Sequence, residues 1–178
     1  FIDGQDITAV DIRAIRRQMG VVLQNGRVMS GDVYSNIISG NPSLNVDDAW
    51  LAASSAGFDE DIHDMPMGMH TVISEGGGTL SGGQRQRLLI SRAIAARPRI
   101  ILMDEATSAL DNRTQSVVTE ALGRMNATRI IIAHRLSTII GADRIYVMDK
   151  GHVIESGTYD ALMTKGGHFY ALAKRQIA

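Results

Sequence analysis

The sequence predicts an α/β protein with a mainly parallel sheet. Apolar runs of strand length, such as Ile130 to Ala133, alternate along the chain with longer helical segments. Parallel neighbours need a crossover connection, so this alternation favours a parallel sheet. Of the 178 residues, 44% are hydrophobic and 21% are charged, which is ordinary for a chain with a packed core. The length fits one domain or an incomplete one.

The expected elements follow from apolar periodicity, capping residues and turn residues. After a strand end and turn at 1–4, we expect a short helix over 7–18, a buried strand over 21–24, helices over 32–39 and 46–56, an irregular stretch over 58–75 and a helix over 81–95. The second half should contain a strand over 100–103, a helix over 113–125, a strand over 129–133, a short helix near 136, strands over 144–148 and 152–155, and C-terminal helices from 159.

Composition excludes several classes of function. A net charge of −1 gives no bulk attraction to nucleic acid or to anionic membranes, and 4% aromatic residues disfavour a stacking platform for single strands. The absence of cysteine excludes disulfides and thiolate metal sites. No apolar run approaches the roughly 18 residues of a membrane span. The chain begins at Phe1, inside an apparent strand, and we therefore expect a fragment of a longer protein.

An acidic pair follows the apolar run Ile100 to Met103. Ligands of open α/β sheets lie at the carboxyl ends of the strands. There Asp104 could hold Mg²⁺ and Glu105 could polarise an attacking water. The alternative is a solvated acid pair at a strand end.

A serine and two glycines open the helix expected over 81–95. Ser81 is a good N-cap, and Gly82 and Gly83 let a ligand approach the backbone closely. A helix N-terminus of this kind can bind an anion. The alternative is a glycine turn before an ordinary capped helix.

Taken together, three segments resemble the ATPase domains of ABC exporters. LSGGQRQR at 80–87, ISRAIAARPRIILMDEATSALD at 90–111 and IIAHRLSTI at 131–139 match the signature, Walker B, D-loop and H-loop in order and spacing. The resemblance covers essentially all 178 residues. It implies an incomplete P-loop NTPase (RecA-like) core with a mainly parallel sheet and a helical signature subdomain. Residues 1–178 would form the C-terminal part of one ATPase domain, in which about 25–95 include the helical subdomain and about 96–178 carry the Walker B, D-loop, H-loop and C-terminal part of the core.

The resemblance also implies roles for individual residues. Asp104 resembles the Mg²⁺-associated aspartate, and Glu105 resembles the general base or water-polarising carboxylate. Gln24 matches the Q-loop glutamine, which senses the metal and the γ-phosphate, and His134 matches the switch histidine on the γ-phosphate. The residues implied to contact the ATP held by a partner domain, or to lie at the interface with it, are Ser81, Gly82, Gly83, Gln84, Ser108 and Asp111.

The function implied by the resemblance is ATP hydrolysis with Mg²⁺ that drives export across a membrane. The implied partners are a second ATPase domain, arranged head to tail, and transmembrane domains, without nucleic acid. The implied location is the cytoplasmic face of the cell membrane, in bacteria the inner membrane. The stretch 64–84, DMPMGMHTVISEGGGTLSGGQ, resembles exporters of bacteriocin-like peptides.

The sequence departs from the family in two respects. The 178 residues contain no G-x-x-x-x-G-K-[ST] motif, whose amides and lysine grip the phosphates, and no counterpart of the aromatic residue that stacks on adenine. We therefore expect the isolated chain to be inactive. Two alternatives stay open: a soluble ABC ATPase acting on DNA or ribosomes, and a non-catalytic interaction fragment. The phrases DEATSALD and IIAHRLST, with no coiled-coil insertion or basic patch, count against the first alternative.

Overall fold

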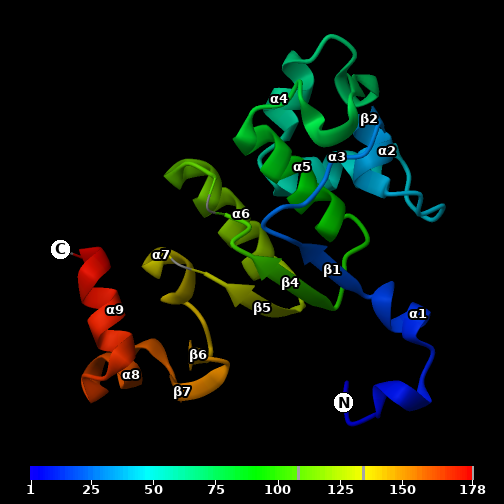
Figure 1. The fold of residues 1–178 in the computed structure, drawn as a ribbon. Helices are drawn as coiled ribbons and strands as arrows, with labels where there is room; N and C mark the ends of the chain where they lie inside the picture. Colours follow the sequence, from blue (N-terminus) through cyan, green and yellow to red (C-terminus); the bar gives the residue numbers. More distant parts are fainter. Residues whose placement is uncertain (108, 134, 178) are drawn as a thin grey trace. The chain divides into compact units, whose positions relative to one another are not determined.

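The alternation of strands and helices is present in the structure, a computed structural model that describes residues 1–107, 109–133 and 135–177. The chain divides into two compact units, Phe1–Ile132 and Ala133–Ala178 (Figure 1). The first unit contains α1 (Ile12–Arg16), β1 (Met19–Val22), β2 (Gly31–Asp32), α2 (Val33–Ile38), α3 (Val46–Ser55), α4 (Asp59–Asp64), β3 (Val72–Ile73), α5 (Gly82–Ile94), β4 (Ile100–Asp104), α6 (Asn112–Arg124) and β5 (Thr128–Ile132), with 3₁₀ turns at Ile7–Ala9, Gly68–His70 and Glu75–Gly77. The second unit contains α7 (Leu136–Ile139), β6 (Ile145–Asp149), β7 (His152–Gly157), α8 (Tyr159–Lys165) and α9 (His168–Ile177).

The main sheet of the first unit has the order β1-β4-β5, and both pairings are parallel. Parallel pairing places the carboxyl ends of all three strands at one edge. The two small pairs, β2-β3 in the first unit and β6-β7 in the second, are antiparallel. The predicted α/β class with a parallel sheet is therefore confirmed.

The two faces of the main sheet differ in burial. Val22 pairs in register with Met103, and both are buried in one core with residues of α5 and α6. On the opposite face Val21 and Ile130, which flank Leu102 in register, are 46% and 56% exposed. The sequence prediction of a buried strand over 21–24 is thus wrong in two respects. The strand is Met19–Val22, and only one of its faces is covered.

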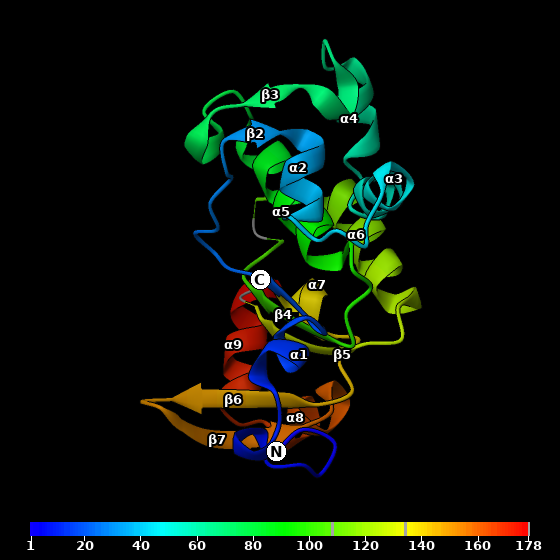
Figure 2. The ribbon, with the colours of Figure 1, turned by 90° about the vertical axis from the view of Figure 1, so that its right-hand side faces the viewer.

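Helices α2 to α5 pack around a second part of the same core. Phe58, Ile37, Ile62 and Leu88 are fully buried there. Figure 2 shows α2 lying beside α5, whose N-terminal half carries the signature segment. The predicted helices over 32–39, 46–56 and 81–95 are found within one or two residues of their expected ends, because capping residues mark most of those ends.

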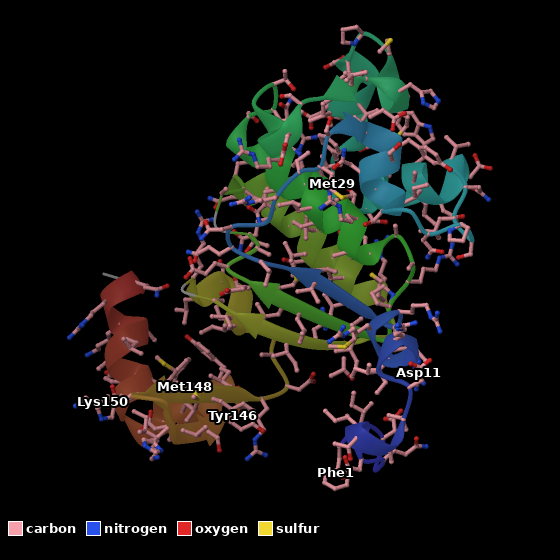
Figure 3. All side chains as sticks on the ribbon, turned by 45° about the vertical axis from the view of Figure 1, so that its right-hand side comes forward. Phe1, Asp11, Met29, Tyr146, Met148 and Lys150 are labelled. Carbon is pink, nitrogen blue, oxygen red and sulfur yellow. The ribbon has the colours of Figure 1, made fainter. Side chains whose placement is uncertain are left out.

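The second unit is an antiparallel hairpin packed on two helices. Its core consists of Ile145, Val147, Leu162, Phe169 and Ala173. Tyr146 and Met148 alternate with the buried positions of β6 and are each 59% exposed (Figure 3). Among the residues that the structure describes, no helix has the length and apolar character needed to cross a membrane.

Candidate functional site

Three of the predicted catalytic and metal-binding residues lie at the carboxyl edge of the main sheet. Asp104 is the last residue of β4, Glu105 follows it directly, and Gln24 lies two residues beyond the end of β1. Because β1 and β4 are parallel neighbours, their ends bring these side chains into one region. His134 and Ser108, predicted for the same site, lie outside the described residues.

Gln24 and Glu105 are joined directly. The Nε2 atom of Gln24 donates a hydrogen bond of 3.0 Å to a carboxylate oxygen of Glu105, across 81 positions of sequence. The backbone of Glu105 is left-handed, with φ 48°, and its N–H donates to the carbonyl oxygen of Ile132 at 3.0 Å. A left-handed conformation is uncommon for a residue other than glycine, and here the turn re-aims the glutamate just after the strand ends.

The donor set at this edge fits Mg²⁺. Asp104 is half-buried, and its carboxylate makes no hydrogen bond or ion pair to a described residue, so its oxygens are available as ligands. Gln24 uses its amide nitrogen on Glu105, which leaves its amide oxygen as a second hard ligand. Among the described residues there is no group of three or more His, Asp or Glu side chains that could hold a metal. A small number of protein ligands is usual for Mg²⁺, because this ion is commonly bound by one or two carboxylates together with water and substrate phosphates.

The signature segment forms a capped helix start. The Ser81 hydroxyl accepts from the Gln84 backbone N–H at 3.2 Å, and the Gln84 side-chain oxygen accepts from the Ser81 N–H at 2.9 Å. This reciprocal capping box satisfies two donors of the first turn. Gly82 and Gly83 occupy the first two helical positions, whose N–H groups have no acceptor within the helix. Such a start is suited to bind an anion.

Gly83 lies against the segment that leads to Asp111. A Cβ atom on Gly83 would be 3.7 Å from the carbonyl oxygen of Ala109. Asp111 is itself the N-cap of α6 and accepts from the backbone N–H of Thr114 at 2.9 Å and from its hydroxyl at 2.8 Å. The Thr114 N–H, and then its hydroxyl, hold the pKa of the Asp111 carboxyl below its ordinary value. Asp111 therefore has a local structural role as the cap of α6, and its role at a domain interface stays a prediction.

One side chain that contacts the signature segment, Asp61, is not predicted by the sequence. Asp61, in the first turn of α4, accepts from Gln84 Nε2 at 3.0 Å and from Arg87 Nη2 at 2.6 Å. It belongs to the run Asp59-Glu60-Asp61, which is typical of a solvated first turn, so the sequence carries no signal for this contact.

A second hydrogen-bond network holds the segment that follows Gln24, through Arg27 and Met29. Arg92 donates to the Asn36 carbonyl oxygen at 2.8 Å, to the Asn36 side-chain oxygen at 2.6 Å and to the Arg27 carbonyl oxygen at 3.0 Å. Asn36, only 1% exposed, also accepts from Met29 N–H and donates to the Met29 carbonyl oxygen. The signal in the sequence is an asparagine among the apolar positions of the helix over 32–39, since such a residue needs buried partners.

Val28 contacts the glycine run Gly76 to Gly78, which precedes the signature segment. Its carbonyl oxygen accepts from the Gly76 N–H at 3.1 Å, and its side chain would lie 3.3 Å from a Cβ on Gly77. Gly77 has φ +69°. The loop after β1 and the loop before α5 are therefore packed on each other.

Curated proteins resemble this chain over nearly all of its length. Residues 1–108 match the family described as ABC transporter. The chain is 43% identical over 173 residues to the alpha-hemolysin translocation ATP-binding protein HlyB of Escherichia coli O157:H7, covering 96% of this chain and 24% of that protein. It is 42% identical over 179 residues to the toxin RTX-III translocation ATP-binding protein of Actinobacillus pleuropneumoniae, covering 99% of this chain and 25% of that protein.

A relative from a plant and a solved structure extend the comparison. ABC transporter B family member 13 of Arabidopsis thaliana is 41% identical over 178 residues, covering 99% of this chain and 14% of that protein. The structure of a bacterial Atm1-family ABC exporter with ATP bound superposes with a TM-score of 0.94 at 36% identity, covering the whole of this chain and 32% of that one. The chain thus spans a quarter or less of the length of these curated relatives. A family match over more than half of its residues, with the same fold in a solved exporter, shows that the chain belongs to the ABC transporter family.

Proposed function

We propose that this chain is the water-activating and partner-contacting part of the ATPase domain of an ABC exporter, in which ATP hydrolysis drives transport across a membrane. The observation that carries the proposal is the contact between Gln24 and Glu105 at the carboxyl edge of the sheet. The Glu105 carboxylate can accept a proton, and the Gln24 amide can orient this carboxylate. Asp104, whose carboxylate is available, directly precedes Glu105.

In this proposal Glu105 acts as the general base. The oxygen of a water molecule attacks the γ-phosphorus of ATP, the bond from that phosphorus to the bridging oxygen of ADP breaks, and the proton of the water passes to Glu105. The hydrogen bond from Gln24 orients the carboxylate for that transfer. Mg²⁺, held by Asp104 and the Gln24 amide oxygen, would neutralise charge on the phosphate oxygens. His134 would contact the γ-phosphate.

The second half of the proposed site serves a neighbouring domain. The amides of Gly82 and Gly83, with the Ser81 hydroxyl, would bind a phosphate at the N-terminus of α5, and the capped helix start supports this role. In the proposed head-to-tail dimer this phosphate belongs to the ATP of the second ATPase domain, and Gln84 supports the turn that meets it. Ser108 and Asp111 would lie at the same interface. The proximity of Gly83 to Ala109 supports a common surface for the signature and D-loop segments.

The proposed partners beyond the second ATPase domain are transmembrane domains, and the proposed location is the cytoplasmic face of the membrane, in bacteria the inner membrane. The relatives are named for the translocation of alpha-hemolysin and of toxin RTX-III. Together with the peptide-exporter resemblance of residues 64–84, these names support a peptide or toxin as the cargo.

Glu105→Gln in the full-length parent protein tests the proposal. The amide is close in size to the carboxylate but cannot accept the proton, so we expect kcat for ATP hydrolysis to fall about 10²–10⁴-fold while ATP binding is retained. Steady-state hydrolysis and equilibrium ATP binding measure the two quantities. Glu120→Gln is the matched control, because Glu120 lies on the exposed side of α6 in a surface pair with Arg124. Turnover near the parental rate in Glu105→Gln would contradict the role of Glu105.

A further inference from the structure

Asp61 links α4 to the signature helix through both of its carboxylate oxygens. Oδ1 accepts from Gln84 Nε2 at 3.0 Å, and Oδ2 accepts from Arg87 Nη2 at 2.6 Å. The Arg87 side chain is 13% exposed and that of Asp61 is 22% exposed, so the ion pair is largely shielded from solvent. Charge-assisted hydrogen bonds of this kind are the strong ones.

Gln84 and Arg87 each reach a different part of the signature turn, which comprises Ser81 to Gly83. Gln84, held by Asp61 through its nitrogen, uses its oxygen to accept from the Ser81 N–H at 2.9 Å. Arg87 places Nη1 3.4 Å from the position of a Cβ on Gly83. The Arg87 guanidinium also lies 6.0 Å from the ring centroid of Phe58, which is fully buried. Asp61 therefore contacts both side chains, Gln84 and Arg87, that lie against Ser81 and Gly83.

Of the three acidic residues in the first turn of α4, only Asp61 makes this contact within the described part of the chain. Asp59 and Glu60 share the first turn of α4 with Asp61. Within the described part of the chain, neither side chain makes a hydrogen bond or an ion pair. The substitution Glu60→Gln thus removes one negative charge from the same turn without touching the signature helix.

We propose that Asp61 is a positioning residue for the signature turn, a proposal that rests on the proposed function of that turn in binding the ATP of a partner domain. By holding the Gln84 amide in one orientation, Asp61 keeps the Ser81 N–H occupied and the amides of Gly82 and Gly83 directed outward. Donors that are preorganised before the phosphate arrives bind it without a cost of reordering. Loss of Asp61 frees the Gln84 amide to rotate and leaves the shielded Arg87 without its carboxylate.

The first experiment compares Asp61→Ala and Asp61→Asn with Glu60→Gln in the full-length parent protein. We expect the KM for ATP to rise about tenfold in Asp61→Ala, the size of one lost hydrogen bond to a charged group. The value of kcat should change less, because Glu105 and Gln24 are untouched. The isosteric Asp61→Asn breaks at least one of the two contacts and should raise KM severalfold, which keeps the test informative if the alanine variant does not fold. Glu60→Gln should keep the parental KM.

The second experiment separates positioning from general stability. If Asp61 acts through Gln84, its substitution should change KM much less in a Gln84→Ala background than in the parent. An equal rise in both backgrounds would overturn the proposal. So would a lower unfolding temperature in both Asp61 variants with a parental KM. A parent that hydrolyses no ATP would instead contradict the proposed function, so the two failures are distinguishable.

Discussion

The loop after β1 and the start of α5 are ordered in different ways. In the loop after β1, Gln24 bonds Glu105. The loop is held by Arg92, which donates to the Arg27 carbonyl oxygen, and by Asn36, which accepts from the Met29 N–H. The start of α5 is held chiefly by its own residues, since Ser81 and Gln84 cap each other across three positions. The sheet edge with Gln24 and Glu105 therefore depends on long-range polar contacts, whereas the start of α5 forms from local ones and receives further support from Asp61.

This difference predicts how far a substitution should propagate. Removing a member of the buried network leaves several polar groups without partners in a region that water reaches poorly, and each such group is costly. Removing a helix cap leaves one N–H at a helix start that is open to water. The largest effects should therefore come from the network behind the loop and the smallest from the caps.

Asn36→Ala should destabilise the ATPase domain of the parent most, by about 3 kcal/mol in the free energy of unfolding. It removes the side-chain oxygen that Arg92 and the Met29 N–H share. Chemical denaturation measures the loss, and hydrogen exchange at the Met29 amide should become faster. Asn112→Ala is the control, because Asn112 is exposed at the start of α6 and should cost less than about 0.5 kcal/mol. Equal stability of the two variants would show that the network does not hold the loop.

Ser81→Ala should have a smaller and more local effect, about 1 kcal/mol of unfolding free energy. The Gln84 N–H loses its acceptor, while the rest of α5 is unaffected. Denaturation again gives the stability, and the exchange rate of the Gln84 amide should report the opened cap. Ser116→Ala provides the contrast, since that hydroxyl only bonds the Asn112 carbonyl within α6 and its loss should be close to neutral. A cost for Ser81→Ala as large as that for Asn36→Ala would remove the distinction between the two regions.

Asp111 should give the smallest effect and one that depends on pH. Its pKa in the folded protein lies below the ordinary value of 3.8, chiefly because of the backbone N–H of Thr114. A depressed pKa stabilises the fold above the ordinary value, and this contribution is lost as the pH falls through the lower folded value. Between about pH 6 and pH 3, Asp111→Asn should therefore lose thermal stability less steeply than the parent domain. Parallel melting curves of the two proteins would contradict the assignment.

The same contrast explains what the sequence could predict. The helix start at Ser81 follows from residues three positions apart, and the edge location of Asp104 and Glu105 follows from the order of strands in a parallel sheet. The bond that Gln84 donates to Asp61 spans 23 positions, and the bond that Arg92 donates to Asn36 spans 56. Both depend on how the helices pack, which no local pattern encodes. The prediction of a buried strand over 21–24 is wrong for a related reason, because an apolar run does not reveal which face of a strand is covered.

The glycine run before the signature has a consequence for how this sequence can evolve. Gly77 combines a left-handed backbone with direct contact to Val28, so a lineage cannot place a side chain there without moving the loop after β1. Gly76 is left-handed with φ +77° but has open space around it, so drift there is limited to residues such as asparagine that tolerate this conformation. Gly78 has neither constraint, since a Cβ would make only an ordinary contact of 3.7 Å with Ser74. The three consecutive glycines thus differ in how readily each can be replaced by another residue.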